Sequence, residues 1–191
     1  MTIGIDISQL AFKNIGVANY LSNLVLNILK NDTKNQYVLF FSSLRDDLPP
    51  DFNNKITSFP NAKIKKFKFP PTFLDLLWNR LHIFPIENLL GQLDIFITSD
   101  WTHPPAKRAK KVTIIYDFTV YKYPHETHGL TEFNMKKFLI YPNIVDIQKR
   151  CHKWVARECD MVLCISESTR KDAGEILGIP KEKLKVVYPG I

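Results

Sequence analysis

The chain of 191 residues lacks the features that mark several large classes of protein. Its longest uninterrupted apolar runs hold about five residues, far fewer than the roughly 20 that span a bilayer, so no transmembrane helix is expected. The N-terminus leads directly into a predicted strand without a charged segment followed by an apolar signal core, which favours a cytoplasmic location. Internal repeats and low-complexity tracts are also missing, so we expect one globular domain with a substantial core.

Cysteine is scarce and poorly placed for a disulfide framework or a metal site. The three residues are Cys151, Cys159 and Cys164, and their spacings of eight and five residues match no zinc-binding pattern. The number is odd, and Cys164 lies inside a predicted buried strand. We therefore expect free thiols in a reducing compartment, and no metal site.

Positive charge is the main compositional signal. The net charge is +7, and it is concentrated in residues 63–68, residues 107–111 and a patch made of Lys149, Arg150, His152, Lys153 and Arg157. Basic clusters bind nucleic acid, anionic lipid or phosphorylated substrates, or form a solvated surface. No nucleic-acid-binding motif accompanies the charge, so nucleic acid is not an expected partner. Anionic lipid, a phosphorylated substrate and a solvated surface all stay open.

Strand-like and helix-like segments alternate along the chain. Between Gly16 and Lys30, for example, apolar residues recur at spacings of three and one, which predicts a helix with one broad apolar face. The alternation indicates an α/β fold with a doubly wound, Rossmann-like parallel sheet, in which ligands bind beyond the carboxyl ends of the strands. The predicted strands are 2–7, 37–41, 62–67, 94–98, 112–116, 161–165 and 184–188, and the predicted helices are 16–30, 72–90 with a break at Pro85, 131–157 with a kink or break at Pro142, and one that follows Ser166.

Two loops that follow predicted strands contain the first candidate functional residues. Residues 8–16 end in Gly16 at a helix N-terminus, where backbone amides and the helix dipole favour an anion. A lone glycine equally fits a simple turn. Residues 99–105 form either the polar and aromatic rim of a ligand pocket or a proline-stiffened connection. The candidate ligand-binding residues of these two loops are Asn14, Ser99, Asp100 and Trp101.

Two further loops follow the strands predicted at 112–116 and 161–165. Tyr116 and Asp117 come first, and the aspartate is either a ligand-binding residue or a turn and capping residue. Ser166 and Glu167 come later, and a helix-capping role explains both of them fully. A smaller possibility is that the hydroxyls of this loop face a ligand.

Three segments of the chain together resemble one protein family. The segments are IGIDISQL…NIGVANYLSNLVLNIL, VTIIYDFTVYKYP and DMVLCISESTRKDAGEILGIPKEKLKVVYPGI, of which the last reads as strand, capped helix, glycine stop and strand. In this order they resemble the N-terminal domain of family 4 glycosyltransferases of the GT-B fold. The resemblance covers nearly the whole chain, residues 1–191, and it implies the acceptor-side domain of an enzyme whose donor-binding domain is absent from these residues.

The resemblance implies a retaining transfer of a sugar from a nucleotide-sugar to a saccharide or lipid-linked acceptor. In the family the glycine matched by Gly16 lies close to the donor phosphates, and a histidine beside the transferred sugar stands where this chain has Tyr116. A tyrosine hydroxyl donates a hydrogen bond but, with an ordinary pKa of about 10, moves protons poorly at neutral pH. The resemblance places Tyr116 and Asp117 at the catalytic centre, where the carboxylate of Asp117 would bind sugar hydroxyls. It also implies acceptor-binding roles, facing an interdomain cleft, for Asn14, Ser99, Asp100, Trp101, Ser166 and Glu167.

The family's paired glutamates and basic residues that hold the donor lie in its second domain, and nothing in this chain replaces them. We therefore expect residues 1–191 to be inactive alone, as a truncated chain or as half of a split enzyme completed by a partner chain. No cofactor is expected beyond the nucleotide-sugar co-substrate. Two other functions stay open: a non-catalytic binding module for a protein partner or an anionic ligand, and another GT-B enzyme such as a nucleotide-sugar epimerase.

The stretch of residues 67–81 is aromatic, apolar and flanked by lysines. It could rest on the inner face of a membrane or accept a lipid-linked sugar. Its large apolar side chains, Phe73, Leu74, Leu76, Leu77, Trp78 and Leu81, would equally pack as core, and this is the interpretation that we favour.

Overall fold

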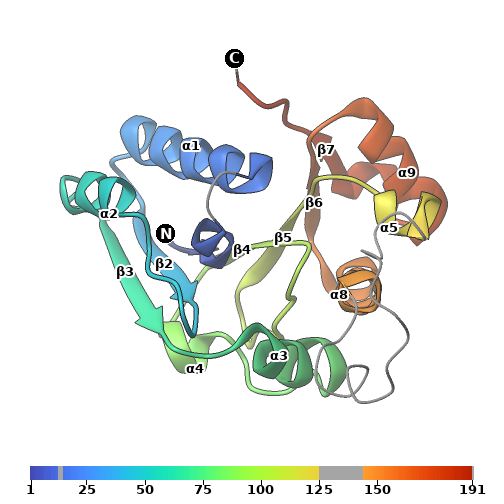
Figure 1. Ribbon diagram of the computed structural model, residues 1–191. Helices are drawn as coiled ribbons and strands as arrows, with labels where there is room; N and C mark the ends of the chain where they lie inside the picture. Colours follow the sequence, from blue (N-terminus) through green and yellow to red (C-terminus); the bar gives the residue numbers. More distant parts are fainter. Residues whose placement is uncertain (13–14, 125–143, 191) are drawn as a thin grey trace. The chain divides into compact units, whose positions relative to one another are not determined.

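The computed structural model describes residues 1–12, 15–124 and 144–190. Seven strands in these parts of the chain form one all-parallel sheet in the order β3-β2-β1-β4-β5-β6-β7, with helices on both sides (Figure 1). This is the doubly wound arrangement, in which the chain winds outward in both directions from the centre of the sheet. The α/β, Rossmann-like fold class predicted from the sequence is confirmed.

The elements match the predicted alternation closely. The strands are β1 (Thr2–Asp6), β2 (Gln36–Ser42), β3 (Ala62–Phe67), β4 (Ile95–Ser99), β5 (Lys110–Ile115), β6 (Met161–Cys164) and β7 (Leu184–Val186). The helices within the described ranges are η1 (Ser8–Ala11), α1 (Gly16–Asn31), α2 (Pro50–Thr57), α3 (Pro71–Leu74), the π-helical η2 (Asp75–Arg80), α4 (Glu87–Leu90), α5 (Thr119–Lys122), α8 (Ile144–Glu158), α9 (Glu167–Leu177) and η3 (Lys181–Lys183). The short elements η1, α2, α5 and η3 were not predicted from the sequence. Residues 131–143 of the helix predicted before β6 lie outside the described residues.

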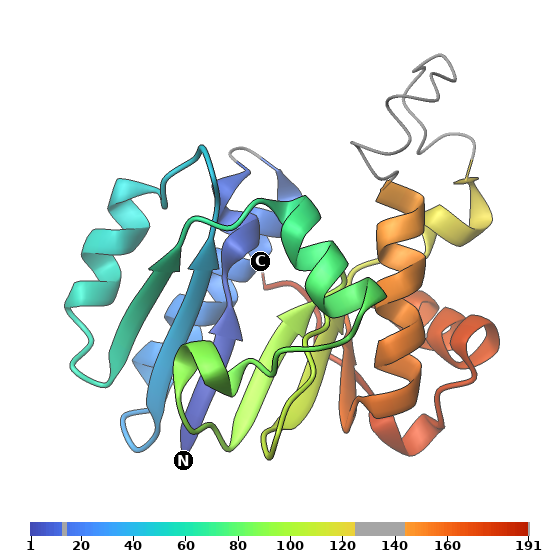
Figure 2. The same cartoon turned by 90° about the horizontal axis from the view of Figure 1, so that it is seen from below.

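The chain divides into two compact units. Unit 1 holds residues 1–71, 85–97 and 106–110, and unit 2 holds residues 72–84, 98–105 and 111–191. In unit 1, helices α1 and α2 lie on one face of the strands β1 to β3, and α4 lies on the other (Figure 1). In unit 2, helices α3 and α8 lie on one face of the strands and α9 on the other (Figure 2).

Unit 1 is built around β1, which pairs in parallel with β2 and with β4. The face of α1 that packs inward carries Ala18, Leu21, Val25 and Leu29, which are all buried and follow the helical repeat. Gly4 in β1 has no room for a side chain, because a Cβ atom would lie 2.7 Å from the Phe96 ring and 2.8 Å from the Leu93 side chain. Close packing across β1 therefore explains a glycine in the middle of a strand.

Unit 2 confirms the capped helix predicted near the C-terminus. The Ser166 hydroxyl accepts a hydrogen bond from the Thr169 backbone N–H at 3.0 Å, and Gly178 ends α9 with a left-handed φ of 66°. The three cysteines are free and buried, as predicted. They contribute to a core cluster that also contains Ile115, Phe118, Val155, Val162, Ala173, Ile179 and Leu184.

The stretch predicted to pack as core is only partly buried. Leu74 and Trp78 are buried, but Phe73, Leu76 and Leu81 are exposed, so the core prediction is wrong for these three residues. None of the helices that the structure describes has the length and apolar character needed to cross a bilayer.

Candidate functional site

Each of the four loops chosen from the sequence follows the carboxyl end of a strand, and two of them are joined by a hydrogen bond in unit 2. The Thr169 hydroxyl, at the first turn of α9, donates to the backbone carbonyl of Tyr116 at 3.1 Å. The same hydroxyl lies 2.9 Å from the Ser166 hydroxyl. The first turn of α9 therefore fixes the backbone of Tyr116, which lies between the end of β5 and Asp117.

Asp117 and Tyr116 differ sharply in accessibility. Asp117 is exposed, and one of its carboxylate oxygens accepts a hydrogen bond from the Thr119 backbone N–H at 2.8 Å, which starts α5. Tyr116 is buried. An exposed carboxylate at the carboxyl end of a strand is accessible to the hydroxyl groups of a ligand, whereas the buried Tyr116 side chain is much less accessible.

The loop at residues 99–105 runs back over the interior of unit 2. Ser99 and Asp100 are buried, and the Asp100 carboxylate accepts a hydrogen bond from the Gln148 side chain of α8 at 3.2 Å. Asn79 of η2 holds the next residues, because its amide donates to the Trp101 carbonyl at 2.8 Å and accepts from the His103 backbone N–H at 3.1 Å. The loop is therefore a connection held by hydrogen bonds to η2. Of the candidates Ser99, Asp100 and Trp101, only Trp101 is partly exposed.

His103, in the same loop, is a fully buried imidazole. Its Nδ1 atom lies 3.3 Å from the Thr113 hydroxyl, while its Nε2 atom has no hydrogen-bond partner in the described parts of the chain. Burial, reinforced by the nearby Lys111 ammonium, lowers the pKa of His103 well below its ordinary value. The ring is therefore neutral at physiological pH and acts as a packing residue.

His152 of α8 is a second buried imidazole and lies beside the Tyr116–Asp117 loop. Its ring stacks on Tyr121 with centroids 5.7 Å apart and lies 5.5 Å from the Phe118 ring. Neither ring nitrogen has a hydrogen-bond partner within the ranges that the structure describes. Burial lowers the pKa of His152 to about 4, although the carboxylate of Asp117 opposes the shift.

Unit 1 contributes the loop before α1 and a pocket. Gly16 is the first residue of α1 and is exposed, and a Cβ atom there would meet open space. Its φ lies outside the left-handed region, so the glycine is not required by backbone strain. Asn14 lies outside the described residues, so its acceptor-binding role stays a prediction.

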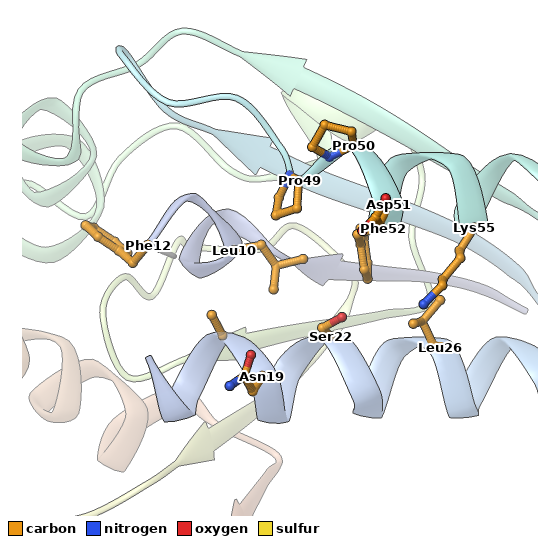
Figure 3. A pocket seen from close by; sticks show the side chains of 11 residues that line it. Leu10, Phe12, Asn19, Ser22, Leu26, Pro49, Pro50, Asp51, Phe52 and Lys55 are labelled. Atoms are coloured by element: carbon orange, nitrogen blue, oxygen red, sulfur yellow. The ribbon is translucent and has the colours of Figure 1, made fainter. Parts of the chain in front are cut away.

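The pocket in unit 1 has a volume of about 400 Å³, at the low end of the range for small-molecule sites. Figure 3 shows the side chains of Leu10 and Phe52 pointing from η1 and α2 toward α1, with Ser22 and Lys55 beside them. The full lining is Leu10, Phe12, Ala18, Asn19, Ser22, Leu26, Pro49, Pro50, Asp51, Phe52 and Lys55. Sequence analysis missed this pocket, because it depends on α2, which was not predicted.

A comparison with known protein families agrees with the resemblance found in the sequence. The sequence model described as Glycosyltransferase Family 4 matches residues 16–191 of the chain. The chain belongs to glycosyltransferase family 4. A search of curated proteins finds no match. The matched segment includes the loops after β4, β5 and β6, together with the whole capped helix α9.

A solved glycosyltransferase shares the fold of this family 4 domain. The structure of apo UGT2 from Phytolacca americana superposes with a TM-score of 0.52 at 10% sequence identity. The superposition covers 100% of this chain and 52% of the UGT2 chain, so the family 4 domain spans about half the length of that protein. At this identity the likeness concerns the fold alone.

The remaining candidates of the family 4 domain are Ser166 and Glu167. Ser166 caps α9, and exposed Glu167 forms an ion pair with Arg170 at 2.7 Å within the first turn. Ser166 therefore has the capping role that the sequence pattern predicted, and Glu167 is an acidic residue in the first turn of α9, as expected. The predicted basic patch on α8 is divided, because His152 is buried and Arg150 binds Asp75, whereas Lys149, Lys153 and Arg157 are exposed.

Proposed function

We propose that this chain is the acceptor-side domain of a retaining glycosyltransferase that moves a sugar from a nucleotide-sugar to a saccharide or lipid-linked acceptor. The observation that carries the proposal is the family 4 match over residues 16–191. The fold supports it, because candidate loops of the family follow the carboxyl ends of parallel strands, where α/β folds bind ligands.

Within this proposal Asp117 is the residue that touches the transferred sugar. Its exposed carboxylate, fixed by the Thr119 N–H, accepts hydrogen bonds from sugar hydroxyl groups. Tyr116 is a positioning residue, because it is buried and its carbonyl is held by Thr169. The proton that the acceptor loses goes to the leaving diphosphate, which serves as the base, so the reaction does not require an imidazole at the position of Tyr116.

The donor-binding half of the enzyme lies, in this proposal, outside residues 1–191, either on the same polypeptide or on a partner chain. The proposal rests on the observation that the chain superposes on 52% of the UGT2 chain. Gly16 is the donor-facing residue of this half, because it leaves the first backbone amides of α1 open to a diphosphate. No metal is assigned to the reaction.

The pocket of unit 1 suits the acceptor. Its lining contains the apolar side chains Leu10, Leu26 and Phe52, together with polar groups such as Ser22 and Lys55. A mixed lining of this kind binds an amphipathic molecule by burying its apolar part and hydrogen-bonding its polar part. We expect Ser22→Phe, which fills the space, to raise the KM for the acceptor without lowering the unfolding midpoint.

The test uses residues 1–191 assembled with the donor-binding half. Sugar transfer is followed with labelled nucleotide-sugars, and the anomeric configuration of the product is read by NMR. We expect retention, a loss of about 100-fold in kcat/KM for Asp117→Ala, and a raised KM for the nucleotide-sugar in Gly16→Val.

Asp47→Ala is the matched control for Asp117→Ala, because Asp47 is also exposed but lies in the loop before α2. Unchanged turnover in Asp117→Ala would remove the aspartate from the site, and inversion would exclude the retaining reaction. Turnover by residues 1–191 alone would contradict the placement of the donor half. Nucleotide-sugar binding without any transfer in the assembled protein would favour a binding module instead.

A further inference from the structure

The helical segment formed by α3 and η2 exposes large apolar side chains while it buries two polar ones. Asp75 and Asn79 are 1% and 3% exposed and lie inward with Leu74 and Trp78, whereas Phe73 and Leu76 are 42% and 45% exposed. A helix on the surface of a soluble protein normally buries its apolar stripe and exposes its polar one. This arrangement indicates that the outward face is covered by something apolar when the protein works.

Specific polar contacts hold the segment in this orientation. The Asp75 carboxylate accepts hydrogen bonds from Arg80 Nε at 2.9 Å and from a guanidinium nitrogen of Arg150 in α8 at 2.9 Å. Trp154, one turn further along α8, donates its indole N–H to the Asn79 carbonyl at 2.8 Å. Because a buried carboxylate without cationic partners is costly, a rotation that buried Phe73 and Leu76 in place of Asp75 would be unfavourable.

The residues that follow η2 extend the exposed apolar surface. Leu81, Ile83 and Phe84 are 56%, 52% and 41% exposed. His82 between them is anchored, because its Nδ1 lies 2.8 Å from the Trp78 carbonyl and its ring stacks on Trp154 with centroids 3.6 Å apart. The anchor fixes the turn and leaves the neighbouring apolar side chains pointing outward.

Cationic side chains border this apolar surface. Figure 2 shows that the helical segment of α3 and η2 reaches α8 at its η2 end, and η2 contacts α8 directly. The Arg157 guanidinium lies 5.5 Å from the centre of the Trp154 ring, which itself covers His82. Arg80 is exposed within the surface, and Lys153 is exposed one turn before Arg157. Exposed apolar side chains bordered by arginine and lysine are the composition that binds an anionic lipid surface.

We propose that Phe73, Leu76, Leu81, Ile83 and Phe84 form a docking surface for an anionic lipid bilayer, with Arg80, Lys153 and Arg157 contacting lipid head groups. The apolar side chains enter the head-group region, and the cations bind phosphate. A second copy of the chain is a poorer occupant, because a self-complementary contact would bring like-charged borders together. The docking surface goes beyond the proposed sugar transfer and does not depend on it.

Vesicle co-sedimentation tests the proposal with the full chain. Vesicles contain phosphatidylcholine alone or with one third phosphatidylglycerol. We expect binding to the mixed vesicles, about tenfold weaker binding for Leu76→Ser/Leu81→Ser, and similar weakening for Lys153→Gln/Arg157→Gln or at high salt. Leu44→Ser is the matched control, because Leu44 is 52% exposed and lies outside the surface.

Three outcomes would overturn the proposal. Equal binding to both kinds of vesicle would remove the role of the cations, and equal weakening by Leu44→Ser would remove the role of this surface. Absence of vesicle binding, together with a dimer in size-exclusion chromatography that Leu76→Ser/Leu81→Ser dissociates, would identify a protein interface instead. Circular dichroism of each variant shows that the fold is retained, so loss of binding is not mistaken for unfolding.

Discussion

The buried imidazole of His152 makes the stability of this domain sensitive to acid. In the folded protein burial lowers its pKa to about 4 from an ordinary 6.5. The unfolded chain therefore binds this proton more readily, and its contribution to stability is complete above pH 6.5 and is lost as the pH falls toward 4. The perturbation that isolates this contribution is His152→Phe, which keeps an aromatic ring against Phe118 and Tyr121 and removes the titration.

The size of the effect follows from the two pKa values. One pKa unit corresponds to about 1.4 kcal/mol, so protonation of the unfolded state lowers the free energy of unfolding by about 2 kcal/mol between pH 7 and pH 5. The full difference, reached below pH 4, is about 3 kcal/mol. Solvent does not screen this contribution to stability, because the His152 side chain is fully buried.

The assay is urea unfolding of the wild type and His152→Phe at pH 7 and pH 5. At pH 7 we expect the two free energies of unfolding to agree within about 1 kcal/mol, because the ring shape is kept and two unsatisfied nitrogens are removed. Between pH 7 and pH 5 the free energy of unfolding of the variant, relative to that of the wild type, should rise by about 2 kcal/mol. Asp117→Asn should steepen the acid sensitivity, because the Asp117 carboxylate raises the pKa of His152.

A difference between the two proteins that stays the same at both pH values would refute the reasoning. It would mean that His152 has the same proton affinity folded and unfolded, so that the ring is hydrated or hydrogen-bonded in solution. The histidine C2-proton shift followed by NMR from pH 8 to pH 3 checks this independently. A folded-state titration midpoint near 6.5 would likewise refute the lowered pKa.

Three further changes test the packing described above by urea unfolding. Gly4→Ala should lower the free energy of unfolding by about 1 to 3 kcal/mol, because the new Cβ overlaps the Phe96 ring, and an unchanged value would show that the ring can move. Ser166→Ala should cost about 1 kcal/mol by removing the cap of α9, while Ser166→Asp should restore most of it. Asp75→Ala should cost about 3 kcal/mol, near the low end for a broken buried ion pair because both of its arginine partners reach solvent, and a loss under about 1 kcal/mol would mean that the pair contributes little.

Local signals in the sequence were sufficient for most of the secondary structure. The capped helix α9, with Ser166 at one end and Gly178 at the other, depends on hydrogen bonds and dihedral angles within a few residues. The strands were predictable because apolar runs bounded by turn residues form buried parallel strands. Short helices such as α2 were not, because four to eight residues give too little periodicity to recognise.

The order of the three matching segments was sufficient to predict the family. It could not show which candidate residues are accessible. Asp117 is exposed while its neighbour Tyr116 is buried, and Ser99 and Asp100 lie inside unit 2. Accessibility depends on which helices cover a loop, and these helices are distant in the sequence.

The sequence by itself therefore determined the alternation of elements, the parallel sheet, the free thiols and the family, since each depends on short-range pattern or on motif order. Only the tertiary structure decided which way the residues of α3 and η2 face. Asp75 turns inward because Arg150, which is distant in the sequence, meets it there, and Leu76 is left outside. Hydrophobicity alone favours burial of Leu76 over Asp75, because a charged pair across two helices is invisible until both helices are in place.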